Sequence, residues 1–152
     1  LTEKMKLTGC PAFAGHDSRD HREPMQLKLT TWNINSVRLR INLVAKFIKA
    51  VRPDVLCLQE IKCPDDAFPR KRFKRLGYEH IALNGQKGYH GVAVISRLPF
   101  DSKTMKGYCG QTDPRHVGAL LAAPTGLRHR LTTHTYYAPD DGAQTARERN
   151  QT

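Results

Sequence analysis

Apolar and polar positions along this chain follow two different periods, and the period predicts where strands and helices lie. Residues 27–33 carry apolar and β-branched side chains that suit a strand, and apolar residues recur at helical spacing from 39 to 51. Pro53 ends that helix, and the continuous apolar run 55–58 is typical of a strand covered on both faces. The first predicted unit is therefore strand, helix and buried strand, with the second strand in the middle of a sheet.

Short strands separated by Gly and Pro dominate the rest of the pattern. A short basic helix is expected over 70–76, because Pro69 suits its first turn and Gly77 suits a helix C-cap. The later apolar runs are bounded by turn residues, which is typical of hairpins. We expect strands over 78–83, 91–97, 117–123 and 131–137. The predicted fold class is α/β, with two helices early and mostly hairpin-like strands later.

The two ends of the chain lack this periodicity. Residues 1–24 mix charged and polar side chains without a repeating apolar pattern, which predicts a disordered leader. Residues 140–152 are polar and are interpreted as a tail unrelated to the fold. The expected domain therefore covers residues 25–139, a common size for one globular unit.

Charge restricts the class of partner. The 25 Lys and Arg residues outnumber 14 Asp and Glu, and the formal charge of +11 creates a field that favours polyanions such as nucleic acid or acidic membrane surfaces. A basic protein that is merely soluble is the alternative interpretation. No apolar run approaches the roughly 18–20 residues that span a bilayer, so no membrane insertion is expected.

Cysteine usage indicates the compartment. The four cysteines form neither a CxxC pair nor a set with zinc-ligand spacing. They are Cys10, Cys57, Cys63 and Cys109. Such usage is typical of a reducing environment, and we expect a cytoplasmic protein. A structural disulfide between Cys57 and Cys63 is the alternative that the sequence leaves open.

Polar side chains follow both predicted central strands at their carboxyl ends. Asn33 and Asn35 occupy alternate positions, so their amides point the same way, and Glu60 ends the second strand. Open α/β sheets usually bind their ligands at this edge. The alternative interpretations are a solvated loop carboxylate and a pair of amides that cap turns.

Three segments around these residues resemble one enzyme family. They are TWNINSVRLR (31–40), LQEIKCPDDAFP (58–69) and NGQKGYHGVAVISRLP (84–99). Their order and spacing are similar to those of the exonuclease III and apurinic/apyrimidinic-endonuclease family, within the endonuclease/exonuclease/phosphatase superfamily. The resemblance runs from about Leu27 to His116. It implies the amino-terminal half of a four-layered α/β sandwich, and a magnesium-dependent nuclease that cleaves DNA at abasic sites and 3′ ends in base-excision repair.

The resemblance also implies roles for the strand-end residues. Glu60 matches the metal-binding glutamate of the family, which suits Mg²⁺ because that ion takes oxygen ligands and only one or two protein carboxylates; Mn²⁺ is the alternative ion. Asn33 matches an asparagine that lines the catalytic pocket, and Asn35 stands where some relatives carry a metal-side aspartate. Tyr137 matches the active-site tyrosine that hydrogen-bonds the scissile phosphate, with Tyr136 as the alternative counterpart.

Double-stranded DNA is the partner that the resemblance implies. Arg115 lies in a segment similar to the Asp-x-Arg-His segment of the family, and Arg38 and Lys87 lie within the matching segments as candidate phosphate contacts. A solvated turn is an equally good account of Arg115. The basic run 70–75 either contacts DNA or is the solvent-exposed face of its helix.

Further catalytic groups of the family lie downstream of the tyrosine segment. They are an Asp that orients the attacking water, an Asn beside it, and a late Asp-His pair. Residues 143–151 contain no counterpart, so we expect a truncated chain that is inactive or strongly impaired unless a separately encoded carboxyl-terminal half supplies these groups. A non-catalytic DNA-binding remnant and a poorly folded product are the alternatives.

Overall fold

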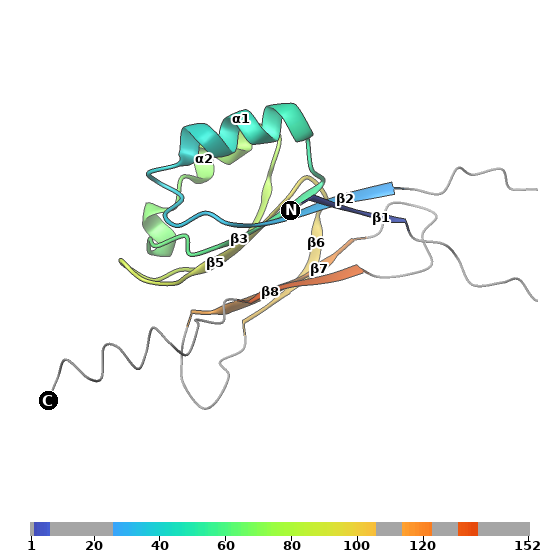
Figure 1. The fold of residues 1–152 in the computed structure, drawn as a ribbon. Coiled ribbons are helices and arrows are strands. Elements are labelled where there is room, and N and C mark those ends of the chain that lie inside the picture. Colours follow the sequence, from blue (N-terminus) through green and yellow to red (C-terminus); the bar gives the residue numbers. More distant parts are fainter. Residues whose placement is uncertain (1, 7–25, 106–113, 123–130, 137–152) are drawn as a thin grey trace, which may run out of the picture.

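A computed structural model describes residues 2–6, 26–105, 114–122 and 131–136 of the chain. Figure 1 shows three layers, with helices over one face of a sheet and a second sheet against its other face. The elements are β1 Thr2–Lys6, β2 Gln26–Asn33, α1 Ile41–Val51, β3 Val55–Gln59, the short 3₁₀ helix Asp65–Ala67, α2 Arg70–Lys74, β4 His80–Asn84, β5 Val92–Ser96, β6 Phe100–Thr104, β7 His116–Leu121 and β8 Leu131–Tyr136.

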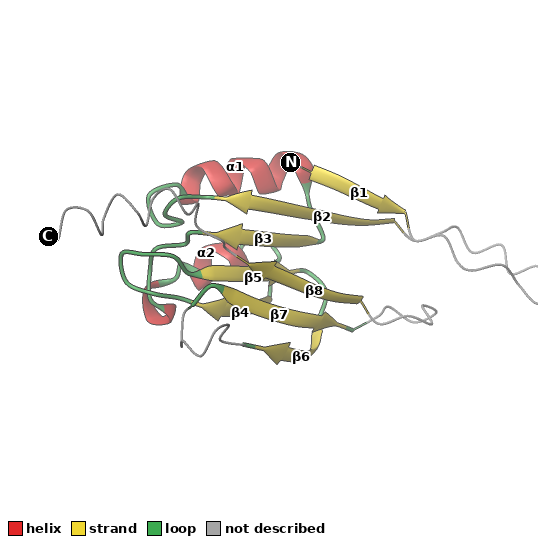
Figure 2. Cartoon of the chain, turned by 60° about the horizontal axis from the view of Figure 1, so that its bottom comes forward, coloured by secondary structure: helices red, strands yellow, loops and turns green. Residues whose placement is uncertain are grey.

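The larger sheet is built around the unit that the sequence predicts. Its strand order is β1-β2-β3-β5-β4, and Figure 2 shows these strands side by side. Strands β2 and β3 are parallel and are joined by α1, whereas β3, β5 and β4 pair antiparallel. Strand β3 lies in the middle of the sheet, as its continuous apolar run predicts.

Alternate residues of β3 pack in two different hydrophobic cores. Leu56 and Leu58 face the helices and pack in one buried cluster with Val44 of α1 and Phe73 of α2. Cys57, between them, packs toward the smaller sheet. Because successive side chains of a strand point to opposite faces, β3 holds the helical layer and the second sheet together.

The smaller sheet has the order β6-β7-β8 and covers the other face of the larger sheet. Val117, Ala119 and Leu121 alternate along β7 and are fully buried against the larger sheet, in a cluster with Val55 and Val94. Burial of Val117 or of Leu121 stabilises the fold by about 1.5–3 kcal/mol. The predicted α/β class and face-to-face sheets are therefore confirmed.

The structure adds two strands to those predicted. Strand β6 has only Phe100 half-buried and four exposed residues, so it carries no apolar alternation to detect. The segment Thr2–Lys6 forms β1, antiparallel to β2, and differs there from the predicted leader because backbone pairing needs no particular side chain. Residues 7–25 lie outside the described part of the chain. No helix among the described residues has the length and hydropathy to cross a membrane.

Strand β3 is anchored at its amino end by a junction of hydrogen bonds. The amide of Asp54 donates to the Lys28 carbonyl at 2.8 Å, and the amide of Lys28 donates to Asp54 Oδ2 at 2.9 Å. The amide of Arg97 donates to the Asp54 carbonyl at 3.0 Å. The hydroxyl of Tyr78, a fully buried side chain, donates to the carbonyl of Pro53. This junction fixes the entry to β3 against the ends of β2 and β5.

Replacement of Tyr78 by Phe tests this junction. The change leaves the Pro53 carbonyl without its hydroxyl donor, so we expect the free energy of unfolding to fall by about 1–3 kcal/mol. Tyr89→Phe is the matched control, because Tyr89 is half exposed on a loop and is expected to change stability by less than about 0.5 kcal/mol. Equal effects in urea denaturation would contradict the role of the buried hydroxyl.

Ionisation of the same hydroxyl makes the stability of the fold depend on pH in alkaline solution. Burial raises the pKa of Tyr78 from 10.0 to about 12, with Arg97 lowering and Asp54 raising it to a smaller extent. Since the folded pKa lies above the unfolded one, the stabilisation is complete below pH 10 and is lost as pH rises from 10 to 12. Tyr78→Phe should remove that part of the alkaline loss of stability.

Candidate functional site

The parallel pairing of β2 and β3 continues beyond the ends of both strands. The amide of Ile34 donates to the Gln59 carbonyl at 3.0 Å, and the amide of Ser36 donates to the Glu60 carbonyl at 2.7 Å. The amide of Val37 extends the series to the Ile61 carbonyl. The two segments that leave the strands therefore run side by side, and this brings their polar side chains together at the carboxyl edge of the sheet.

Asn33, Asn35, Glu60 and Lys62 form one connected set of hydrogen bonds, which we call the edge cluster. The Asn33 side-chain amide donates to Glu60 Oε1 at 2.8 Å, and Lys62 Nζ lies 2.9 Å from Glu60 Oε2. Lys62 Nζ also donates to Asn35 Oδ1 at 2.7 Å, while Asn33 Oδ1 accepts the backbone amide of Asn35. Each carboxylate oxygen of Glu60 thus has a partner from a different residue.

The ion pair of the edge cluster is half-buried, whereas Asn33 and Asn35 are exposed. The Glu60 side chain is 16% exposed and that of Lys62 is 32% exposed. At this depth an ion pair is screened less than a surface pair, and its hydrogen bonds fix the direction of the carboxylate. The sequence interpretation missed Lys62, although it lies two residues after Glu60 within the matching segment.

Backbone strain is concentrated at this edge. Asn35, Ser36, Glu60, Lys62 and His90 all adopt positive φ angles, between 40° and 82°. Such conformations are uncommon outside Gly and cost about 1–3 kcal/mol each for residues other than Asn or Asp. The surrounding hydrogen bonds hold the loops in shapes that turn the side chains of the edge cluster toward one another.

A third loop, between β4 and β5, closes against the edge cluster. The amide of Ile61 donates to the Gly91 carbonyl at 3.1 Å, and the amide of Lys62 donates to the His90 carbonyl at 3.0 Å. Gly85 donates its amide to Asp65 Oδ1, and a Cβ at Gly85 would lie 2.5 Å from the Cys63 carbonyl. These close approaches need glycine and hold three loops in one layer.

The thiol nearest this edge is inert. Burial raises the pKa of Cys63 from 9.0 to about 11; the Arg38 charge lowers it, and Asp65 and Asp66 raise it further. The thiol is therefore neutral near pH 7 and is no nucleophile. Cys57 and Cys63 are both free, so the disulfide left open by the sequence does not form.

Gln59 links the edge cluster to the second sheet. Its side-chain amide donates to Thr31 Oγ1 at 2.8 Å and to Thr135 Oγ1 at 2.6 Å. Thr135 lies near the end of β8, two residues before Tyr137, which itself lies outside the described residues. The sequence interpretation missed Gln59, whose position at the end of a strand gave no sign of a contact across the sheets.

The predicted DNA-binding residues occupy separate positions. Arg38 and Lys87 are exposed on the loops after β2 and after β4, both at the carboxyl edge. Arg115 is half-buried and immediately precedes β7. In the basic run 70–75 only Phe73 is buried, and the charged residues of this run are exposed. The structure brings Arg38 close to Cys63 but places none of these cations in the edge cluster.

Comparison with known proteins identifies the family. The sequence profile described as the endonuclease/exonuclease/phosphatase family matches residues 30–151, which is most of the chain. The chain belongs to the endonuclease/exonuclease/phosphatase family. The match extends across residues 140–151, the segment interpreted above as a polar tail.

Relatives within this family are nucleases and a phosphatase. The chain is 42% identical over 71 residues to exodeoxyribonuclease III of Haemophilus influenzae, which covers 47% of this chain and 26% of that protein. An AP endonuclease from Archaeoglobus fulgidus superposes with a TM-score of 0.60 at 36% identity, covering 63% and 37%. The 3′ phosphatase NExo from Neisseria, bound to a product DNA hairpin, superposes with a TM-score of 0.63 at 29% identity. The match covers 81% of this chain and 48% of that one.

The resemblance stated from the sequence is confirmed by these matches, which place the chain among exonuclease III-like members of an enzyme family. The chain spans about a quarter of the matched Haemophilus protein and less than half of each solved structure. The matched part thus corresponds to a portion of the family fold.

The donor chemistry of the edge cluster fits a divalent metal of this family. Glu60 offers a carboxylate, and Asn33 and Asn35 offer amide oxygens, which are the oxygen donors that Mg²⁺ prefers. No group of three or more His, Cys, Asp or Glu that could hold a metal occurs among the described residues. A single carboxylate suits an ion that keeps several of its waters.

Substitution of Gly91 tests how tightly the loops are packed. Gly91 and Gly88 share a φ of 79°. A Cβ added at Gly91 would lie 2.7 Å from Ile61 Cγ1, whereas a Cβ added at Gly88 would have no atom within 4 Å. Gly88→Ala should cost only the backbone strain, about 1–2 kcal/mol. Gly91→Ala should cost about 1–3 kcal/mol more, because it also displaces Ile61 beside Glu60. Equal losses in urea denaturation of the two variants would show that this contact is not tight.

Proposed function

We propose that this chain carries the metal-binding part of a site that hydrolyses phosphodiester bonds of DNA, of the exonuclease III type. The observation that carries the proposal is the edge cluster, in which Asn33 and Lys62 hold the Glu60 carboxylate in a fixed direction. The edge at which it lies is the usual ligand position of open α/β sheets. The names of the relatives, an exodeoxyribonuclease and an AP endonuclease, support DNA repair as the context.

In this proposal Glu60 holds Mg²⁺ or Mn²⁺, and Asn35 contributes a neutral oxygen or a hydrogen bond to a metal-bound water. A bound divalent cation would polarise a phosphate oxygen and lower the barrier to attack on phosphorus. Asn33 keeps the carboxylate aligned and presents its amide to the phosphate. Lys62 balances the charge of Glu60 when no metal is present and remains beside Asn35 afterwards.

Double-stranded DNA is the proposed partner. Arg38 and Lys87 are exposed at the edge that carries Glu60, so their charges favour phosphates of a bound strand. Arg115 is proposed as a third phosphate contact. Tyr137 is proposed to hydrogen-bond the scissile phosphate, and the bond between Gln59 and Thr135 supports this by bringing the end of β8 toward Glu60.

We further propose that the catalytic and binding roles lie within residues 25–139, and that residues 1–24 and 140–152 carry none of them. The free thiols Cys57 and Cys63 support a reducing, cytoplasmic location. With one carboxylate in the edge cluster, Mg²⁺ is expected to bind the isolated chain only in the millimolar range. Efficient cleavage is expected to need further groups, an aspartate base and an Asp-His pair, from another polypeptide segment.

A comparison of Glu60→Gln with the unaltered chain tests the metal role. Glu60→Gln removes the only carboxylate of the edge cluster, so Mn²⁺ affinity should fall at least tenfold in a calorimetric titration. Glu79→Gln is the matched control, because Glu79 is exposed and pairs only with Lys74 among the described residues. Loss of affinity in Glu79→Gln, or none in Glu60→Gln, would show that the metal binds elsewhere.

The catalytic part of the proposal needs a cleavage assay. The isolated chain should nick an abasic-site duplex at near-background rate in Mg²⁺, and nicking should rise when the carboxyl-terminal part of an exonuclease III relative is added as a separate polypeptide. Glu60→Gln should abolish the rise. Robust nicking by the isolated chain, or a rise that survives Glu60→Gln, would contradict the assigned roles.

A further inference from the structure

A second polar site lies at the opposite end of the larger sheet from the edge cluster. A pocket of about 460 Å³ opens there, and its lining residues are Ile48, Lys49, Arg52, Arg75, Leu76, Gly77, Tyr78 and Arg97. We call it the basic pocket. Its volume falls within the roughly 300–1,000 Å³ typical of small-molecule sites.

Strand register fixes the separation of the two sites. Val55, at the start of β3, and His80, at the start of β4, both pair with Ser96, which directly precedes Arg97. Gln59, which precedes Glu60, pairs with Val92 at the other end of β5. The five-residue length of β3 therefore separates the basic pocket from Glu60 by about 17 Å.

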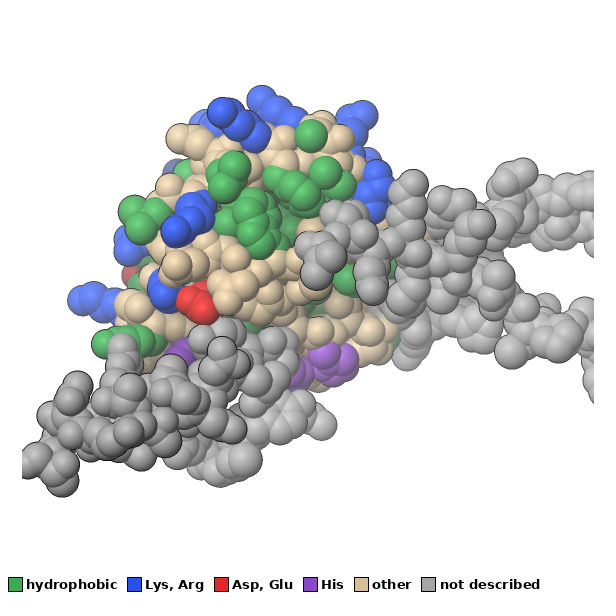
Figure 3. All heavy atoms as spheres, in the orientation of Figure 1, with side chains coloured by type: hydrophobic (Ala, Val, Ile, Leu, Met, Phe, Trp, Pro, Cys, Tyr) green, Lys and Arg blue, Asp and Glu red, His purple; other side chains and the backbone are tan. Residues whose placement is uncertain are grey.

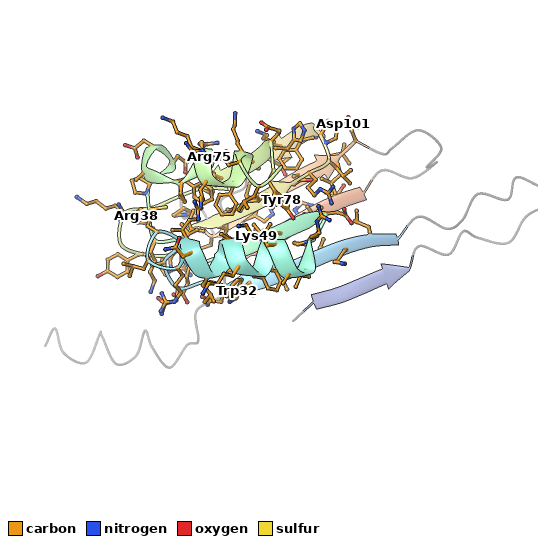
Figure 4. The ribbon with its side chains drawn as sticks, turned by 90° about the horizontal axis from the view of Figure 1, so that it is seen from above. Trp32, Arg38, Lys49, Arg75, Tyr78 and Asp101 are labelled. Carbon is orange, nitrogen blue, oxygen red and sulfur yellow. The ribbon has the colours of Figure 1, made fainter. Side chains whose placement is uncertain are left out.

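Four cations converge on the basic pocket from three parts of the fold. Lys49 lies on the last turns of α1 and Arg52 caps that helix, while Arg75 follows α2 and Arg97 follows β5. Figure 4 shows Lys49 and Arg75 on either side of Tyr78, with Arg38 farther away toward the carboxyl edge. Figure 3 shows Lys and Arg side chains gathered over the helical layer.

The positive charge of the basic pocket is little compensated by the described residues. Arg97 is the one of the four cations that forms an ion pair within the described chain, with Asp54 Oδ1 at 3.6 Å, and no carboxylate lines the pocket. Cations held together without counter-charges repel one another, and this repulsion is relieved when an anion binds. The guanidinium groups add forked donors that match phosphate oxygens.

The carboxyl end of α1 does not cancel the preference of the basic pocket for an anion. A helix carboxyl terminus carries a partial negative charge, but here the Ile48 carbonyl accepts the amide of Arg52 and the Val51 carbonyl accepts Lys28 Nζ at 2.7 Å. The base of the pocket is rigid, because Tyr78 is fully buried and bonded to Pro53. A Cβ at Gly77 would meet no atom within 4 Å, so the space above this residue is open.

We propose that the basic pocket binds a compact phosphate-bearing small molecule of about mononucleotide size. The phosphate lies among Arg52, Arg75 and Lys49, and Leu76 offers an apolar wall to the rest of the ligand. A DNA strand would favour cations spaced along a track, whereas these converge on one hollow. The site does not depend on Glu60 or on a metal, so it stands apart from the proposed nuclease function.

The test uses the full 152-residue chain and pyrophosphate or deoxyadenosine monophosphate as probes, in low salt without divalent metal. The pocket variant is Arg52→Glu with Arg75→Glu. The matched control is Lys71→Glu with Arg72→Glu, which changes the net charge equally at exposed positions outside the pocket lining. We expect the pocket variant to lose at least tenfold in probe affinity and the control less than threefold. Equal losses, or none in either variant, would overturn the proposal.

Probe binding should shift the backbone amide resonances of Gly77 and Tyr78 and leave that of Glu60 in place, and shifts confined to the Glu60 edge would overturn the proposal. If the charge reversals unfold the chain by circular dichroism, Arg52→Gln with Arg75→Gln replaces them. A pocket variant that weakens binding of a short DNA duplex but not of pyrophosphate would assign the pocket to backbone phosphates and contradict the small-molecule proposal.

Discussion

The candidate site depends on one constraint, the parallel pairing of β2 with β3 and its continuation into the loops that follow. Backbone hydrogen bonds from Ile34, Ser36 and Val37 to the last residue of β3 and the two residues after it carry the register past the strand ends. Without this continuation Asn33 and Glu60 would leave the sheet in different directions. Their 2.8 Å hydrogen bond is thus a consequence of sheet geometry first and of side-chain chemistry second.

The fold supports this constraint from both faces of β3. Leu56 and Leu58 are held by the helical layer, and Val55 and Cys57 by the second sheet, so the strand has little freedom to shift along its neighbours. A shift of one residue would move each of these side chains to the opposite core. The loops at the carboxyl edge can therefore hold positive φ angles that a loosely packed scaffold would relax.

Much of this arrangement is predictable from the sequence, because periodicity and position at strand ends are local properties. The βαβ unit, the buried strand 55–58 and the location of Asn33, Asn35 and Glu60 at one edge follow from them. Lys62 and Gln59 escaped prediction since their roles arise from contacts with Asn35 and Thr135, which only tertiary structure brings near. Strands β1 and β6 escaped because backbone pairing, and not an apolar pattern, defines them.

The two ends of the larger sheet carry different electrostatics. In the edge cluster one carboxylate and one ammonium pair among amides, whereas four cations line the basic pocket. A divalent cation should therefore bind at the edge cluster and not in the basic pocket.

The most direct measurement is the broadening of backbone amide resonances by substoichiometric Mn²⁺. We expect the amide resonances of Asn33, Asn35 and Glu60 to broaden first, while those of Gly77 and Arg97 remain sharp. Uniform broadening, or broadening centred away from Glu60, would contradict it.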